Sequence, residues 1–171
     1  MSYKMANYGL CMHLDKFIER DYPQLISWIS SEEFNYLWGG PVYKYPLTIK
    51  QITAHVSKAE VTPLMLRDNE LEIGYIELHR ESESTYRLCR VLIADESVRG
   101  KGYGKVLVNL AIDHAKKAFN ATTINLAVFE HNQNAVNCYQ SLGFNVIRKE
   151  AGLRSFNGDR WNLLYMELNN I

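Results

Sequence analysis

The stretch from Arg99 to Lys105 contains residue types that can bind phosphate. It reads Arg-Gly-Lys-Gly-Tyr-Gly-Lys, follows the apolar run 91–94 and precedes the apolar-periodic segment 106–119. A strand, a glycine turn and a helix in that order leave backbone N–H groups unpaired at the helix N-terminus, where the helix dipole also favours an anion. The stretch therefore predicts a binding loop for a phosphate-bearing ligand.

Two other phosphate-binding patterns fit this loop poorly. A P-loop places Ser or Thr after its Lys to hold Mg²⁺, whereas Val106 follows Lys105 here. A Rossmann fingerprint has the spacing Gly-x-Gly-x-x-Gly early in a βαβ unit, whereas this Gly-x-Gly-x-Gly lies late in the chain. An NTP-binding domain is therefore disfavoured. A glycine turn without a ligand stays an alternative, although a simple connection needs fewer than three alternating glycines.

A second motif lies downstream, between Asn132 and Phe144. It reads Asn-x-Asn-Ala-x-x-x-Tyr-x-x-Leu-Gly-Phe. Together with Arg-x-x-Gly-x-Gly in the first stretch, it resembles the two cofactor-binding motifs of the GNAT N-acetyltransferase superfamily. The specific resemblance covers about residues 91–150. Residues 38–48 are similar to the members related to the ribosomal-protein and polyamine acetyltransferases.

The elements that must position these motifs follow from hydrophobic periodicity. It predicts helices over residues 21–29, 31–38, 48–58, 106–119 and 132–142, with Asp21 and Thr48 as helix caps. It predicts strands over 9–17, 62–67, 70–79, 86–94, 122–129, 144–149 and 160–168. The resemblance implies an α+β fold of mixed α/β type, with a central, mostly antiparallel mixed sheet of about seven strands, a splayed central pair and about four flanking helices.

Composition limits the function classes. The chain has 171 residues, a formal net charge of zero and 47% hydrophobic residues, which is typical of one globular domain spanning residues 1–171. Zero net charge argues against a general nucleic-acid binder. The sequence shows no signal peptide or membrane-spanning run, so no membrane partner is expected. Cys11, Cys89 and Cys138 match no zinc or disulfide spacing, which predicts a cytoplasmic protein without a metal site.

The resemblance implies acetyl-CoA as the cofactor. The loop amides would hold its pyrophosphate, and the strand before the loop would pair with the pantetheine arm and direct an N–H at the thioester carbonyl. Asn132 would hydrogen-bond the pantetheine. The implied cofactor-binding residues are Leu92, Ile93, Ala94, Arg99, Gly100, Lys101, Gly102, Tyr103, Gly104, Lys105 and Asn132.

The resemblance also implies a catalytic residue, Tyr139, as the general acid that protonates the leaving sulfur. Its alternative role is a half-buried aromatic packed on the core. Some relatives carry a glutamate general base where this chain has Ala127, so no base is assigned. The remaining candidates are an ordered water or the side chains of Glu77, Asp95, Glu130 and His131.

The function expected from these motifs is transfer of an acetyl group from acetyl-CoA to a primary amine. The amine, a protein N-terminus, a polyamine or another small amine, would attack directly in a ternary complex. The aromatic residues 43–45 would form a wall of its site or pack on the sheet. A non-catalytic acyl-CoA sensor is the alternative. The final strand and exposed aromatics could support a homodimer.

Overall fold

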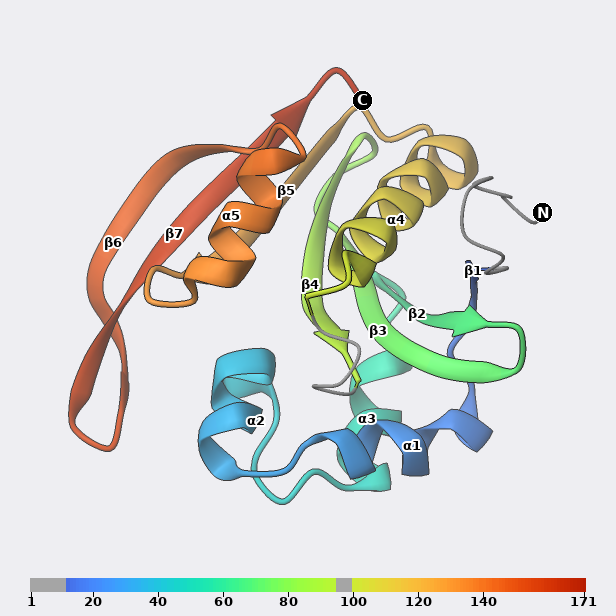
Figure 1. Ribbon diagram of the computed structural model, residues 1–171, viewed down its shortest axis with the longest axis horizontal. Coiled ribbons are helices and arrows are strands. Elements are labelled where there is room, and N and C mark those ends of the chain that lie inside the picture. The colour runs from blue at the N-terminus through green and yellow to red at the C-terminus, as the bar shows by residue number, and fades with distance from the viewer. Residues whose placement is uncertain (1–11, 95–99) are drawn as a thin grey trace.

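A seven-stranded mixed sheet forms the centre of the computed structural model, which describes residues 12–94 and 100–171. The strand order is β1-β2-β3-β4-β5-β7-β6 (Figure 1). All neighbouring strands are antiparallel except β4 and β5, which are parallel. This confirms the expected mixed sheet. The strands are β1 (Met12–Lys16), β2 (Val61–Asp68), β3 (Leu71–Arg80), β4 (Thr85–Ile93), β5 (Thr123–Phe129), β6 (Asn145–Phe156) and β7 (Asp159–Asn169).

Five α-helices in the described residues match the predicted segments. They are α1 (Tyr22–Trp28), α2 (Glu32–Gly39), α3 (Ile49–Val56), α4 (Tyr103–Phe119) and α5 (Gln133–Ser141), with short 3₁₀ turns at Glu19–Asp21 and Gly40–Val42. Thr48 caps α3 as predicted, because its Oγ1 accepts from the Gln51 N–H. Asp21 is the N-cap residue of α1, as predicted, but its side chain makes no capping hydrogen bond to the helix. Its carboxylate accepts instead from the Ile18 N–H and pairs with Arg67.

The helices cover the two faces of the sheet separately. Alternate residues of β2 point to opposite sides, as the two-residue period of a strand requires. Leu64 and Leu66 pack in the core beneath α4 and α5, whereas Met65 packs with α1, α2 and α3. The face below α4 and α5 is called the α4 face here, and the other is called the α2 face.

A bulge in β4 changes which side chains face each layer. Leu88 belongs to the core of the α4 face, and Leu92, four residues later, belongs to the core of the α2 face. A regular strand would place both on one face. The extra residue is Arg90, whose φ of 52° is the left-handed conformation found at bulges.

A buried charge cluster on the α2 face holds this bulge. The Arg90 guanidinium lies 2.5 Å from the Glu77 carboxylate, and Glu77 is fully buried. His55 Nε2 lies 2.8 Å from the same carboxylate, and the Tyr75 hydroxyl donates to it at 2.7 Å. Burial alone would raise the pKa of Glu77, but the His55 hydrogen bond and the Arg90 charge outweigh it and lower that pKa. Glu77 is therefore a buried carboxylate anion.

Strands β4 and β5 diverge beyond the start of the bulge. They pair from Thr85 with Thr123 to Leu88 with Leu126 and no further. Strand β5 then continues beside β7 as far as Phe129, so an opening forms between the two central strands. This is the splayed central pair expected from the sequence.

None of the helices in the described part of the chain combines the length and the apolar character needed to cross a bilayer.

We predict that Glu77→Gln lowers the free energy of unfolding by about 3 kcal/mol, because it leaves the buried Arg90 charge without its carboxylate. Urea denaturation at pH 7 measures this. The control is Glu81→Gln, which breaks the half-exposed pair with Arg87 and should cost less than about 1 kcal/mol. Equal losses in the two variants would contradict the prediction.

The Glu77→Gln variant should also respond differently to acid pH in its free energy of unfolding. A lowered pKa in the folded protein means that Glu77 contributes stability above its ordinary value of 4.5 and loses that contribution as the pH falls through the lowered value. Stability should therefore fall less steeply below pH 4.5 in Glu77→Gln than in the wild type. Thermal denaturation between pH 3 and pH 7 measures the two slopes.

Candidate active site

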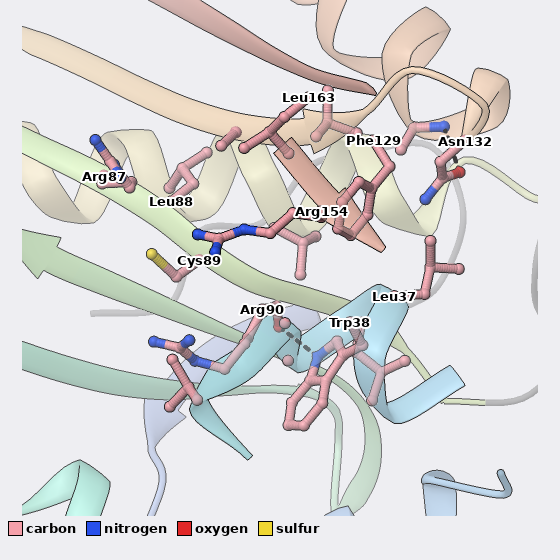
Figure 2. Close-up of a pocket in the computed structure, with 18 of the residues that line it drawn as sticks. Leu37, Trp38, Arg87, Leu88, Cys89, Arg90, Phe129, Asn132, Arg154 and Leu163 are labelled. Atoms are coloured by element: carbon pink, nitrogen blue, oxygen red, sulfur yellow. Dashed lines mark hydrogen bonds between the residues drawn. The ribbon is translucent and has the colours of Figure 1, made fainter. Parts of the chain in front are cut away.

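A pocket of about 340 Å³ occupies the opening between β4 and β5. Its walls come from α2 and the turn after it, from β4, from the end of β5, from α5, and from β6 and β7 (Figure 2). The pocket therefore contains residues from both faces of the sheet. A volume of this size is in the range of small-molecule sites.

Helix α5 places two of the predicted site residues in this pocket, Asn132 and Tyr139. Asn132 is the N-cap of the helix, and its side-chain oxygen accepts from the Ala135 N–H. The amide nitrogen has two N–H donors that make no hydrogen bond with any described residue, and these are the groups that the predicted pantetheine contact can use. The cap thus fixes the orientation of the side chain.

Tyr139 is 7% exposed and packs edge-on against Phe144. Its hydroxyl makes no hydrogen bond with any described residue. Burial raises the pKa of Tyr139 above its ordinary value. The hydroxyl is therefore protonated at neutral pH and is available to donate a proton within the pocket.

The glycine loop leads into α4 through two residues whose backbone conformation only glycine adopts readily. Gly100 has a φ of 77° and Gly102 a φ of 86°. A Cβ at either position would meet no atom of the described residues within 4 Å, so no described side chain covers the loop at these two points. The Lys105 N–H donates to the Gly102 carbonyl, which leaves the amides before Lys105 for the predicted pyrophosphate contact.

The other predicted loop residues differ in position. Lys101 and Lys105 are exposed, whereas Tyr103 and Gly104 are half-buried in the first turn of α4. Arg99 lies outside the described residues.

The backbone of β4 offers one of its three predicted positions on the side of the opening. Leu92 lines the pocket, and the Ala94 N–H already donates to the Ile73 carbonyl of β3. Since N–H groups alternate in direction along an antiparallel strand, the Ile93 N–H points away from β3. The Ile93 N–H therefore lies on the side of the opening, and the pairing of this strand with a pantetheine arm stays a prediction.

None of the three described candidates for the general base lines the pocket. Glu77 is enclosed by its own ion pairs. Glu130 contacts Lys149 and Asn162, and these hydrogen bonds lower its pKa. His131 stacks on Phe129 and packs edge-on against Trp161. Asp95 lies outside the described residues. Ala127 lines the pocket where some relatives carry a glutamate.

The thiols in the described residues are poor nucleophiles. Cys89 lines the pocket, and burial raises its pKa to about 11. Burial also raises the pKa of Cys138. Both side chains are protonated at neutral pH, which agrees with direct transfer rather than a covalent acetyl-cysteine.

Two of the pocket residues, Arg90 and Arg154, carry no local sequence signal, and Trp38 is marked only as the first residue of the segment 38–48. The Trp38 indole N–H donates to the Arg90 carbonyl at 2.9 Å, so α2 is attached to the bulge (Figure 2). Of the aromatic loop, Tyr43 is buried against Trp38, and Tyr45 is exposed. Tyr43 therefore packs in the core rather than forming a wall of the pocket.

We predict that Gly102→Ala weakens coenzyme A binding and lowers the free energy of unfolding by about 1–2 kcal/mol, because a Cβ at positive φ is strained. The control is Gly104→Ala, whose Cβ would meet Cys138 Sγ at an ordinary 3.9 Å and which should be neutral or stabilising within a helix. Urea denaturation and isothermal titration with coenzyme A measure both effects. An equal free energy of unfolding and equal coenzyme A binding in the two variants would contradict the strain assigned to a Cβ at position 102.

Comparison with known proteins places these features in a family. Two curated relatives match part of the chain. A spermine/spermidine N(1)-acetyltransferase of Bacillus subtilis is 35% identical over 66 residues, 39% of this chain and 41% of that protein. A spermidine N(1)-acetyltransferase of Vibrio cholerae is 36% identical over 74 residues, 43% of this chain and 38% of that protein. The chain thus matches less than half the length of each.

Two solved structures share the fold over nearly the whole chain. The crystal structure of spermidine N-acetyltransferase from Vibrio cholerae, in complex with CoA and spermine, has a TM-score of 0.80 at 19% identity and covers 93% of this chain and 95% of that one. The structure of smu.2055 from Streptococcus mutans has a TM-score of 0.74 at 17% identity, covering 92% and 99%. The acetyltransferase (GNAT) family model matches residues 23–144, which is more than half of the chain, and the chain therefore belongs to this family.

Proposed function

We propose that this protein is an acetyl-CoA-dependent N-acetyltransferase that acts on a primary amine. The observation that carries the proposal is the pocket in the opening between β4 and β5, which is lined by both Asn132 and Tyr139. The family membership and the glycine loop at the start of α4 support it. The relatives named as spermine and spermidine acetyltransferases make polyamines the reference amines for an assay.

The residues present fit acetyl-CoA on the α4 face. No described side chain covers the loop at Gly100 and Gly102, so phosphate oxygens can approach the backbone, and the 17-residue helix α4 directs its dipole there. Asn132 supplies a polar side chain along the opening. When bound, acetyl-CoA supplies an acetyl thioester and a thiol leaving group.

Proton positions follow from the groups that line the pocket. The acetyl group moves from sulfur to nitrogen, the amine loses one proton, and the sulfur gains one. The protonated Tyr139 hydroxyl supplies the proton that the sulfur gains. No carboxylate or imidazole occurs among the described lining residues. We assign the proton from the amine to an ordered water, which is one of the bases expected from the sequence; Asp95, another of them, lies outside the described residues.

Release of thiol from acetyl-CoA across a panel of amines and peptide N-termini tests the proposal. The panel includes spermidine, amino acids and their decarboxylated amines. We expect thiol release with at least one acceptor. Binding of acetyl-CoA without thiol release from any of them would favour the sensor alternative.

We predict that Tyr139→Phe lowers kcat by about 10²–10⁴-fold, the range for loss of a general acid. The dissociation constant for acetyl-CoA should stay within about twofold, because the ring and its packing are kept. Tyr86→Phe is the matched control, since Tyr86 is also a buried tyrosine but stacks on Phe119 outside the pocket. An unchanged kcat in Tyr139→Phe would remove the tyrosine from the chemistry.

A further inference from the structure

A bulge in β6 controls the position of Arg154. Glu150 pairs with Leu163 and Arg154 with Trp161, so residues 151–153 of β6 lie opposite the single residue Asn162. The Asn162 side chain fixes this bulge, because its oxygen accepts from the Gly152 N–H and its nitrogen donates to Glu130. A bulge held in this way directs the side chain that follows it.

Arg154 faces the α2 side of the pocket. Its partner Trp161 packs with Tyr36 of α2, and Leu164 and Met166 of the same strand pack beneath α4. Figure 2 shows the Arg154 side chain entering the pocket, with its guanidinium directed toward Cys89 of β4. The predicted phosphate loop begins α4 on the other face. Arg154 is therefore placed for the acceptor rather than for the pyrophosphate.

The charges around the pocket are unbalanced. Three arginines line it. Arg87 pairs with Glu81, and Arg90 pairs with Glu77. Arg154 makes no hydrogen bond or ion pair with any described residue, and no aspartate or glutamate occurs among the described lining residues. The pocket thus presents one uncompensated guanidinium among mainly apolar walls.

We propose that the acceptor amine carries an anionic group, a carboxylate or a phosphate, that pairs with Arg154. This inference rests on the proposed function and names its acceptor class. A planar guanidinium matches the oxygens of either anion in two parallel hydrogen bonds. The apolar walls, which include Phe34, Leu37 and Leu163, strengthen such a pair by excluding water. A polyamine would instead bring further positive charge toward Arg154, with no described lining carboxylate to balance it.

Matched acceptors that differ only in the anionic group test the proposal. Phenylalanine is compared with phenethylamine, lysine with 1,5-diaminopentane, and phosphoethanolamine with ethanolamine; spermidine is the polycation. The wild type should show a kcat/KM at least about tenfold higher for the anionic member of a pair, the range of a hydrogen-bonded charge. The carboxylate and phosphate pairs show which anion is preferred.

Substitutions of Arg154 assign the preference to this residue. Arg154→Gln should bring the ratio within each pair close to one, and Arg154→Glu should reverse it in favour of 1,5-diaminopentane and spermidine. The dissociation constant for acetyl-CoA should not change. The control is Arg80→Gln, an exposed arginine at the end of β3 that does not line the pocket and should keep the wild-type ratio.

Measuring how tightly each amine binds tests the anionic acceptor independently of whether the protein acetylates any amine. Isothermal titration measures each amine against the protein saturated with coenzyme A, which needs no turnover. Tighter binding of the anionic member that is lost in Arg154→Gln supports the proposal, even if no amine is acetylated and the proposed function fails. Equal binding of the pair members by the wild type overturns it. So does an Arg154→Gln variant whose only defect is weaker coenzyme A binding, because Arg154 would then contact the cofactor.

Discussion

The ion pair between Arg90 and Glu77 determines where the two central strands separate. Each of these charges is costly to bury alone, so the side chains must stay in contact inside the protein. The contact holds Arg90 in a left-handed backbone conformation that a regular strand excludes. Trp38 completes the arrangement by hydrogen-bonding the Arg90 carbonyl. Helices α2 and α3 therefore both contribute side chains that hold one point of β4.

The separation of the strands gives the pocket access to both faces of the sheet. On the α4 face, α5 contributes Asn132 and Tyr139, and the glycine loop begins α4. On the α2 face, Trp38 and Arg154 approach the same space. A donor and an acceptor can therefore enter from opposite sides and meet between β4 and β5. The groups proposed to bind anions also differ between the two faces, with backbone amides on one and a guanidinium on the other.

Most of the fold could be predicted because its elements have strong local signals. The apolar stripe of residues 106–119 and the alternation in β2 and β4 depend only on neighbours in sequence. The motif residues Asn132 and Tyr139 belong to the same helix, Asn132 as its N-cap, so α5 places both in the pocket. Strand β6 was predicted only to residue 149, because the bulge at Gly152 interrupts the alternation that marks a strand.

The unpredicted features depend on contacts between distant residues. Nothing local marks Arg90 as the bulge residue, since its partners Glu77 and His55 lie on β3 and α3. Glu77 was a candidate base because its burial and its pairs cannot be read from its own strand. Asp21 has the residue type of a helix cap, but Arg67, 46 residues away, takes its carboxylate. Long-range ion pairs thus override local preferences here.

Because of the bulge in β6, the number of residues between Glu150 and Arg154 determines the position of the Arg154 side chain as much as their types do. The face on which residue 154 lies depends on how many residues separate it from the last regular pair of the hairpin, Glu150 with Leu163. Gain or loss of one residue in this interval would turn the guanidinium out of the pocket while leaving the sequence of every other wall unchanged. Related chains could therefore diverge in acceptor choice through insertions and deletions at this hairpin, with the catalytic and cofactor-binding parts left intact.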